Sequence, residues 1–201
     1  TVNTLYKDSE LTEFIKFVKE LYMIGVDALI VQDAGAANLI KRSFPDMKIN
    51  ASTQLTANTA EDVLFLQKNG FDKVILSREL TLEEIKNIRK STDVDIECFV
   101  HGALCVSFSG QCIMSSILGG RSGNRGCCAQ PCRLPYELYE NRDKVCDGYL
   151  MSPKDVETLE ILPQLIEAGI NSFKIEGRMK NPEYVAGVTS IYRKYIDLYF
   201  D

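Results

Sequence analysis

The sequence contains no tryptophan, only one histidine and no long apolar run. A membrane-spanning helix needs about 18 or more consecutive apolar residues, so no membrane partner is expected. Strong net charge is also missing, because 23 Lys and Arg stand against 28 Asp and Glu, a formal net charge of −5, while 45% of the residues are apolar. This balance excludes a disordered chain and a surface that is basic everywhere, but it leaves room for a local basic patch.

The sequence also lacks the motifs that common hydrolases carry. It holds no HExxH and no GxSxG, and no orienting partner for its single histidine is visible. His101 ends a predicted strand four residues before Cys105, where a Cys/His nucleophile pair is conceivable. A histidine hydrogen-bonded at a strand end explains the same position equally well, so the residues alone do not build a protease.

Cysteine is absent from the first 97 residues and from the last 55, yet the chain between them holds seven. An odd number cannot pair completely into disulfides, and structural disulfides would be spread over the fold that they hold together. Clustered, unpaired thiols suit a reducing compartment, so a cytoplasmic location is predicted. The cysteines are Cys98, Cys105, Cys112, Cys127, Cys128, Cys132 and Cys146.

Three segments, beginning at Gly25, Gly70 and Gly169, repeat one pattern: a glycine suited to a left-handed helix cap, a polar turn and an apolar, β-rich run. Amphipathic helical spacing lies before each glycine, as in the stretch from Leu11 to Tyr22. The pattern predicts strands near 2–5, 27–32, 47–52, 73–77, 95–100, 148–152 and 172–176. Further helices are expected near 36–43, 59–69, 81–90, 155–168 and 182–198.

Alternating helices and nearly continuous apolar strands predict an α/β fold with a parallel sheet covered by helices. About seven such units favour a (β/α) TIM-like barrel, with an open doubly wound sheet as the alternative. Because eight strands close a barrel, we expect residues 1–201 to form a single (β/α)-barrel domain that is incomplete in this chain. Residues 103–147 interrupt the pattern after the fifth strand and predict a long Cys-rich insert on the C-terminal face, where barrel enzymes build their sites.

The predicted insert spaces its cysteines as a C-x6-C pair and a C-x3-C pair among many glycines. Four thiolates from flexible loops hold zinc or an iron–sulfur cluster. Zinc ribbons usually show two C-x2-C knuckles, which this sequence lacks, so the irregular spacing favours a 4Fe-4S cluster as cofactor. Zinc, and plain buried or disulfide-bonded cysteines, stay open as alternatives.

Charged and amide side chains follow several predicted strands. Gln54 follows the third strand, Arg78 the fourth, and Glu176 and Arg178 the seventh. On a barrel they converge at one rim, where carboxylates do acid–base work and arginines grip carboxylate or phosphate groups. Any one of them taken alone also fits a solvated loop charge or a local ion pair.

Residues 103–136 hold Arg121, Arg125 and Arg133 and no acidic residue, a local charge of +3 in an acidic chain. Such a basic, glycine-rich loop suits an RNA backbone or a carboxylate substrate. Balancing a negatively charged thiolate cluster explains the arginines equally well.

Several long motifs carry a resemblance to a known family. They are residues 97–105 with 109–115, residues 119–126 with 128–135, Ser152-Pro153-Lys154-Asp155, and Lys174-Ile175-Glu176-Gly177-Arg178. Together they resemble the signature of the collagenase-like peptidase family U32, close to its branch of tRNA 5-hydroxyuridine and rRNA 5-hydroxycytidine synthases. The resemblance covers essentially the whole chain.

The resemblance implies an iron–sulfur enzyme that hydroxylates a pyrimidine in tRNA, at the wobble uridine, or in rRNA, with prephenate as small-molecule co-substrate. It implies a 4Fe-4S cluster with four cysteine ligands, and it leaves Cys98, Cys127 and Cys146 outside that set. A collagenase-like peptidase and a non-catalytic fragment stapled by zinc are the alternative functions. The implied ligands are Cys105, Cys112, Cys128 and Cys132; the candidate catalytic residues are Glu176, Arg178, Arg78 and His101; and the candidate substrate-binding residues are Arg121, Arg125, Gln54 and Lys174.

Overall fold

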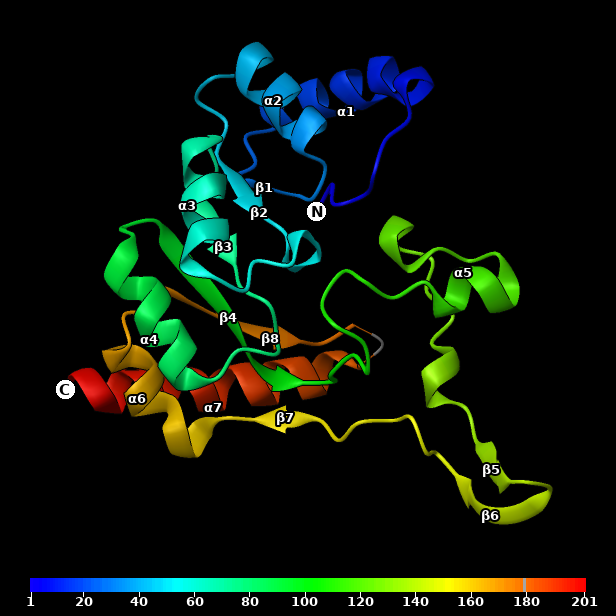
Figure 1. Cartoon of the computed structure of the whole chain (residues 1–201). Coiled ribbons are helices and arrows are strands. Elements are labelled where there is room, and N and C mark those ends of the chain that lie inside the picture. The colour runs from blue at the N-terminus through cyan, green and yellow to red at the C-terminus, as the bar shows by residue number, and fades with distance from the viewer. Residues whose placement is uncertain (179) are drawn as a thin grey trace.

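Five strands run parallel in a curled sheet and follow one another in the order of the chain (Figure 1). In the computed structural model, which describes residues 1–178 and 180–201, Leu29 pairs with Ile49 and Val74 with Ile96. A short strand, β7 (Val156–Glu157), pairs antiparallel with the end of β4. The parallel strands are β1 (Leu29–Val31), β2 (Ile49–Ala51), β3 (Lys73–Ile75), β4 (Asp95–Gly102) and β8 (Ser172–Glu176).

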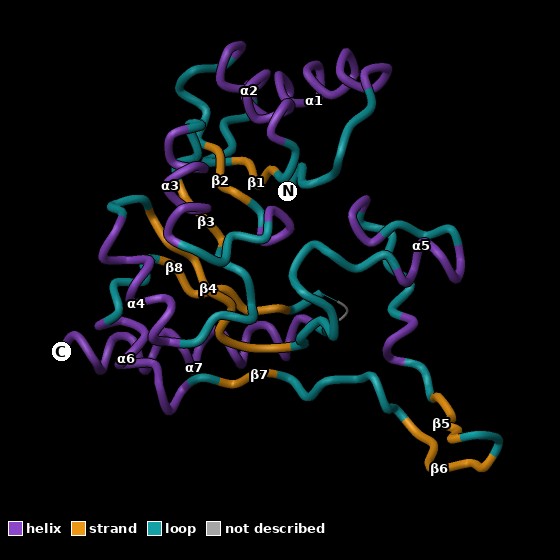
Figure 2. Tube along the Cα trace, viewed as in Figure 1, coloured by secondary structure: helices purple, strands orange, loops and turns teal. Residues whose placement is uncertain are grey.

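Helices connect the parallel strands and cover the outer side of the curled sheet (Figures 1 and 2). Asp33, Thr59, Thr81 and Asn181 begin four of them, because each side chain accepts a hydrogen bond from a backbone N–H of the first turn. Thr59 and Thr81 form complete capping boxes. The helices of this layer are α1 (Leu11–Met23), α2 (Ala34–Ser43), α3 (Ala60–Lys68), α4 (Leu82–Ser91), α6 (Leu162–Glu167) and α7 (Pro182–Phe200).

The core lies between the strands and this helical layer. Val31, Ile49 and Ile96 of the strands are fully buried, as are Ile40 of α2 and Val63 of α3. Removing this apolar surface from water is the main favourable contribution to folding. Because the core holds the strands in register, their carboxyl ends open on one side of the molecule.

The fold class is confirmed as mixed α/β, but the expected strands are wrong at two places. Residues 2–5 form no strand; Val2 only donates one backbone hydrogen bond of 2.9 Å to Ile30 at the edge of β1. Residues 149–151 form a turn, and Tyr149 is 67% exposed. A short apolar run looks the same in a sequence whether it is a buried strand or an exposed turn, which explains the second error.

Two further expectations change with the strands. The helix expected over 155–168 begins as β7 and becomes α6 only at Leu162. The seven expected strands reduce to five parallel ones, so within the described residues the sheet is a half-barrel that does not close. A full barrel is therefore not what these residues form.

The chain leaves the sheet after β4 and returns at β7 (Figure 1). In between it forms only short elements: α5 (Met114–Gly119), turns of 3-10 helix at Gly123–Arg125 and Pro131–Arg133, and a hairpin of β5 (Tyr136–Glu140) and β6 (Asp143–Gly148). This stretch, residues 103–155, carries six of the seven cysteines. In the part of the chain that the structure describes, no helix has the length and apolar character needed to cross a membrane.

Candidate cysteine and arginine site

Four cysteines line one cavity of about 160 Å³. Cys105 follows β4, Cys112 precedes α5, and Cys128 and Cys132 lie on either side of Pro131. Gln54, which follows β2, and Arg78, which follows β3, line the same cavity. The cavity therefore lies at the carboxyl ends of the parallel strands, the side on which (β/α) proteins build their sites.

The loop between Cys105 and Cys112 is fastened to the half-barrel by Ser109, which is only 1% exposed. Its backbone N–H donates to the Glu79 carboxylate, and its hydroxyl accepts a bond of 3.2 Å from the backbone N–H of Arg78. Its carbonyl accepts a bond of 2.8 Å from the Thr56 hydroxyl. A buried group with all its polar atoms paired is costly to displace, so Ser109 holds the loop in place.

The second half of the site is tied down by separate contacts. The Ser115 hydroxyl accepts a bond of 2.9 Å from the backbone N–H of Ala129, next to Cys128. The buried Gln32 amide donates to the Asn124 carbonyl at 2.8 Å. Arg125 forms an ion pair of 2.6 Å with Glu10. The Ser115 bond lies within the cysteine-bearing stretch, and the bonds of Gln32 and Glu10 connect that stretch to the first part of the chain.

The donor set of this cavity suits a metal cluster. Cys105 is exposed and the other three thiols are half-buried, and among the described residues no carboxylate or imidazole lines the cavity. Soft thiolate ligands select zinc and iron–sulfur clusters. In the described residues no group of three or more metal-binding side chains is drawn together as a ready-made site, so the thiols share a cavity without converging on one point.

The electrostatics of Cys132 show that the thiols are neighbours. Burial raises the pKa of Cys132, Arg133 opposes that rise, and the thiols of Cys105, Cys128 and Cys112 raise the pKa further. Each thiolate thus makes the next one harder to form, which is the situation that a bound cation relieves. By donor type, although they do not converge on one point, the four thiols fit a metal cluster.

The other three cysteines do not line this cavity. Cys98 lies in β4 within the core, where burial, with the Glu97 carboxylate next to it, raises the pKa of the thiol to about 12. Cys127 is exposed, and its thiol donates to the Arg125 carbonyl at 3.4 Å. Cys146 is exposed on β6 of the hairpin. The assignment of Cys105, Cys112, Cys128 and Cys132 as cluster ligands stays a prediction.

A second cavity of about 500 Å³ adjoins the first, since Arg78, Cys105, Cys128 and Cys132 line both. Backbone carbonyls orient two of its arginines: Arg121 donates to Cys127 at 3.0 Å, and Arg178 donates to Gly126 at 2.8 Å. Guanidinium groups held in this way bind carboxylate or phosphate groups. The charged residues that line this arginine pocket are Arg78, Arg121, Arg133, Arg178 and Glu176.

Arg78 connects the two cavities. Its guanidinium carbon lies 4.2 Å from the centre of the Phe99 ring, and its Nη2 lies 3.9 Å from Oε2 of Glu176. Glu176 also accepts a bond of 2.9 Å from the backbone N–H of Arg178. The structure thus brings Arg78, Glu176 and Arg178 to one rim, as expected, while their catalytic role stays a prediction.

Three other candidates lie outside both cavities. Lys174 pairs with Glu97 at 3.0 Å, and Arg125 is occupied by Glu10. His101 packs against Tyr184 and Tyr192, with Nδ1 at 3.5 Å from the Tyr192 hydroxyl. These contacts favour the structural interpretation of His101 over a Cys/His nucleophile pair.

Sequence reasoning misses the residues that hold the site together. Ser109 is part of a motif quoted for the resemblance, but nothing in the sequence indicates that Thr56 reaches it. The contact joins residues 53 positions apart, and only the folded chain reveals it.

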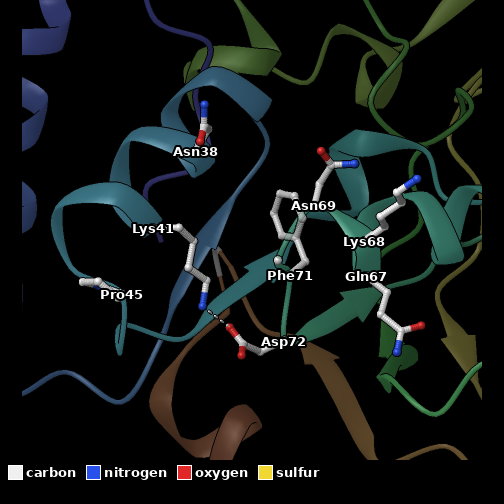
Figure 3. Close-up of a pocket in the computed structure, with 9 residues that line it drawn as sticks. Asn38, Lys41, Pro45, Gln67, Lys68, Asn69, Phe71 and Asp72 are labelled. Atoms are coloured by element: carbon white, nitrogen blue, oxygen red, sulfur yellow. Dashed lines mark hydrogen bonds and ion pairs between the residues drawn. The ribbon is translucent and has the colours of Figure 1, made fainter.

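A further cavity lies between α2 and α3 at the opposite, amino-terminal ends of the strands (Figure 3). Lys41 crosses it and forms an ion pair of 2.9 Å with Asp72. Lys41 also donates to the Met47 carbonyl, and Asp72 accepts a bond from the Ile49 N–H. Because these charges bind neighbouring parts of the chain, the cavity is a structural junction.

Known proteins resemble this chain along its whole length. The model of "Peptidase family U32" matches residues 1–201. Over 199 residues the chain is 45% identical to "23S rRNA 5-hydroxycytidine C2501 synthase" of Escherichia coli (strain K12), covering 98% of this chain and 30% of that protein. It is 37% identical to "tRNA hydroxylation protein P1" of Bacillus subtilis (strain 168), covering 99% of this chain and 49% of that protein.

A third relative bears another kind of name. The chain is 33% identical to "Collagenase" of Porphyromonas gingivalis (strain ATCC BAA-308 / W83), covering 99% of this chain and 51% of that protein. The chain thus spans about half or less of the length of these relatives.

Proposed function

Because the chain belongs to peptidase family U32, we propose that it is part of an iron–sulfur enzyme that hydroxylates a pyrimidine of tRNA or rRNA. Two similar proteins are named for rRNA 5-hydroxycytidine synthesis and for tRNA hydroxylation. The observation that carries the proposal is the cavity that four cysteines line beside the arginine pocket. The same thiols favour a reducing compartment, so the proposed location is the cytoplasm.

In this proposal Cys105, Cys112, Cys128 and Cys132 hold a 4Fe-4S cluster. When bound, such a cluster supplies one-electron chemistry, with a potential that depends on burial and on hydrogen bonds to the sulfur atoms. The chain already provides one such bond, because the backbone N–H of Gln130 donates to the Cys128 sulfur at 3.3 Å. Ser109 and Ser115 keep the two halves of the site in place.

The arginine pocket binds the co-substrate in this proposal. Four guanidinium groups against one carboxylate give the pocket a net positive charge, which suits a dicarboxylate such as prephenate. Glu176 is the one acid of the pocket, and its Oε2 lies at the distance of a loose ion pair from Arg78. A carboxylate in that position can accept a proton at Oε2 while Arg121 and Arg178 hold the co-substrate.

Anaerobic purification followed by metal analysis and an absorption spectrum tests the cofactor. A brown protein with about four irons per chain supports the proposal, and a colourless protein with one zinc refutes it in favour of the zinc staple. Cys112→Ser is expected to lose the iron, whereas Cys146→Ser, which removes an exposed thiol of the hairpin, is expected to keep it.

The activity is tested on RNA. Cells are made to produce the full-length protein that contains this chain. Their RNA is digested to nucleosides, and mass spectrometry is expected to detect a 5-hydroxylated pyrimidine. Cys112→Ser is expected to abolish it. Peptide cleavage that persists in Cys112→Ser, without any hydroxylated nucleoside, would instead support the peptidase that the name of the third relative suggests.

A further inference from the structure

Phe108, Gln54 and Arg78 line the cysteine cavity and are not among the proposed cluster ligands. All three gather around Ser109 and Gly110. Phe108 precedes Ser109 in the chain, the Arg78 N–H bonds to the Ser109 hydroxyl, and the backbone of Gln54 lies against Gly110. All three line the cavity, and each is next to the loop that Ser109 holds or on it.

Phe108 is an exposed aromatic residue on the loop that Ser109 holds. Its side chain is 63% exposed, although it lines the cavity. The Gln111 N–H donates to the Phe108 carbonyl at 3.1 Å, so residues 108–111 form a tight turn that fixes the backbone of Phe108. Single-stranded RNA bases stack on exposed aromatic rings of this kind.

Gln54 and Arg78, which line the same cavity, each carry a hydrogen-bonding atom that pairs with no described residue. Within the described residues, Oε1 of Gln54 and Nε of Arg78 are buried and have no hydrogen-bond partner. A buried polar atom without a partner is costly, so a ligand that pairs with it is favoured. One atom accepts and the other donates, and the edge of a pyrimidine base offers both a donor and an acceptor within one ring.

The two cavities also give two separate approaches to the same thiols. Arg121, Arg133 and Arg178 line only the arginine pocket, whereas Gln54, Phe108 and Cys112 line only the smaller cavity. A small dianion in one pocket leaves the other approach open for a base. An enzyme that acts on a base must take it out of the stack into a pocket of this type.

We propose that Phe108, Gln54 and Arg78 form the pocket for the target pyrimidine, with the base stacked on the Phe108 ring and its edge bonded to Gln54 and Arg78. The inference rests on the proposed function, since it names where the RNA substrate of that same site binds. A turn of the Gln54 amide presents either its oxygen or its nitrogen, so this residue suits both cytosine and uracil.

The test measures binding of short single-stranded RNA to the 201-residue chain. Two labelled heptanucleotides are compared. They are identical except that the fourth, central nucleotide carries cytosine in one and no base in the other. The parent chain is expected to bind the cytidine probe about tenfold or more tightly than the abasic probe. Phe108→Ala is expected to remove that difference, Phe108→Trp to keep it, and Gln54→Leu to reduce it.

Ile117→Ala is the matched control, because Ile117 is 72% exposed on the same stretch and lines neither cavity. Equal binding of both probes by the parent overturns the inference, and so does a Phe108→Ala chain that still distinguishes them. If Phe108→Ala weakens binding of the cytidine probe and of the abasic probe by the same factor, base stacking on Phe108 is also refuted. Iron content, measured on the same samples, tests the proposed function separately: a chain that holds iron and fails these binding tests contradicts only the base pocket.

Discussion

Gly110 packs so closely against Gln54 that a Cβ atom on Gly110 would lie 2.4 Å from the Gln54 carbonyl oxygen. Its φ of +77° lies in the left-handed region, which other residues adopt at a cost. The contact brings the loop with Cys112 onto the turn after β2. One glycine therefore sets how near the cysteines come to the half-barrel.

Gly110→Ala is expected to displace this loop. The added methyl group meets backbone that has no room to move, so we expect a loss of about 1–3 kcal/mol in the free energy of unfolding. We also expect less iron per chain after anaerobic purification. Denaturant titration and iron analysis measure the two effects. Gly119→Ala is the control, since nothing lies within 4 Å of its added Cβ; equal losses in both variants would contradict the explanation.

Ser109→Ala tests the bond that fastens the same loop. The variant removes the hydroxyl that accepts a hydrogen bond from the backbone N–H of Arg78. The unpaired N–H is expected to lower the free energy of unfolding by about 1–3 kcal/mol. Ser107→Ala, two residues away and half-buried, is expected to cost less than Ser109→Ala. Urea titration of both variants checks the prediction, and an unchanged midpoint for Ser109→Ala would refute the fastening role.

The cysteines are expected to differ in reactivity. Burial raises the pKa of Cys98 to about 12, so at about pH 8 this thiol stays protonated as well as shielded. Iodoacetamide is expected to label the exposed Cys146 in the folded chain and to spare Cys98. Peptide mass spectrometry locates the label, and urea is expected to abolish the protection. Equal labelling of the two thiols in the folded chain would show that Cys98 is not in the core.

The ion pair of Glu10 and Arg125 is expected to make the anchoring of the cysteine-bearing stretch depend on pH. The hydrogen bond from Arg125 holds the pKa of Glu10 below its ordinary value. A carboxylate with a lowered pKa stabilises the folded state above its unfolded pKa, and this stabilisation disappears as the pH falls through the lowered pKa. The pair is therefore intact near neutral pH and lost in strong acid.

Hydrogen exchange of the backbone amides of residues 123–126 measures this anchoring. At about pH 6 the Glu10→Gln chain is expected to exchange faster there than the parent, and this difference is expected to disappear as the pH falls through the lowered pKa of Glu10. Glu13→Gln, a change of an exposed glutamate on α1, serves as the control. A difference between Glu10→Gln and the parent that persists in acid would refute the pairing as its cause.

Local patterns in the sequence predict the parts of this protein that depend on local chemistry. Thr59 and Thr81 begin their helices because a side-chain oxygen pairs with the next turn, and the apolar runs around Val31, Val74 and Ile96 form the parallel strands. The apolar run at 149–151 shows the limit of such patterns, because it forms an exposed turn where a strand is expected. Whether a short run pairs depends on a neighbouring strand, which the run itself does not specify.

The sequence by itself determined the parallel α/β architecture, the cluster of cysteines between 98 and 146, and the family to which the chain belongs. Only the tertiary structure decided which cysteines share a cavity, that Gln54 and Arg78 line it too, and that Arg125 is occupied by Glu10. The physical reason is the range of the interactions. Caps and apolar periodicity act within one or two turns, whereas the site depends on contacts between residues up to 120 positions apart, which exist only in the folded chain.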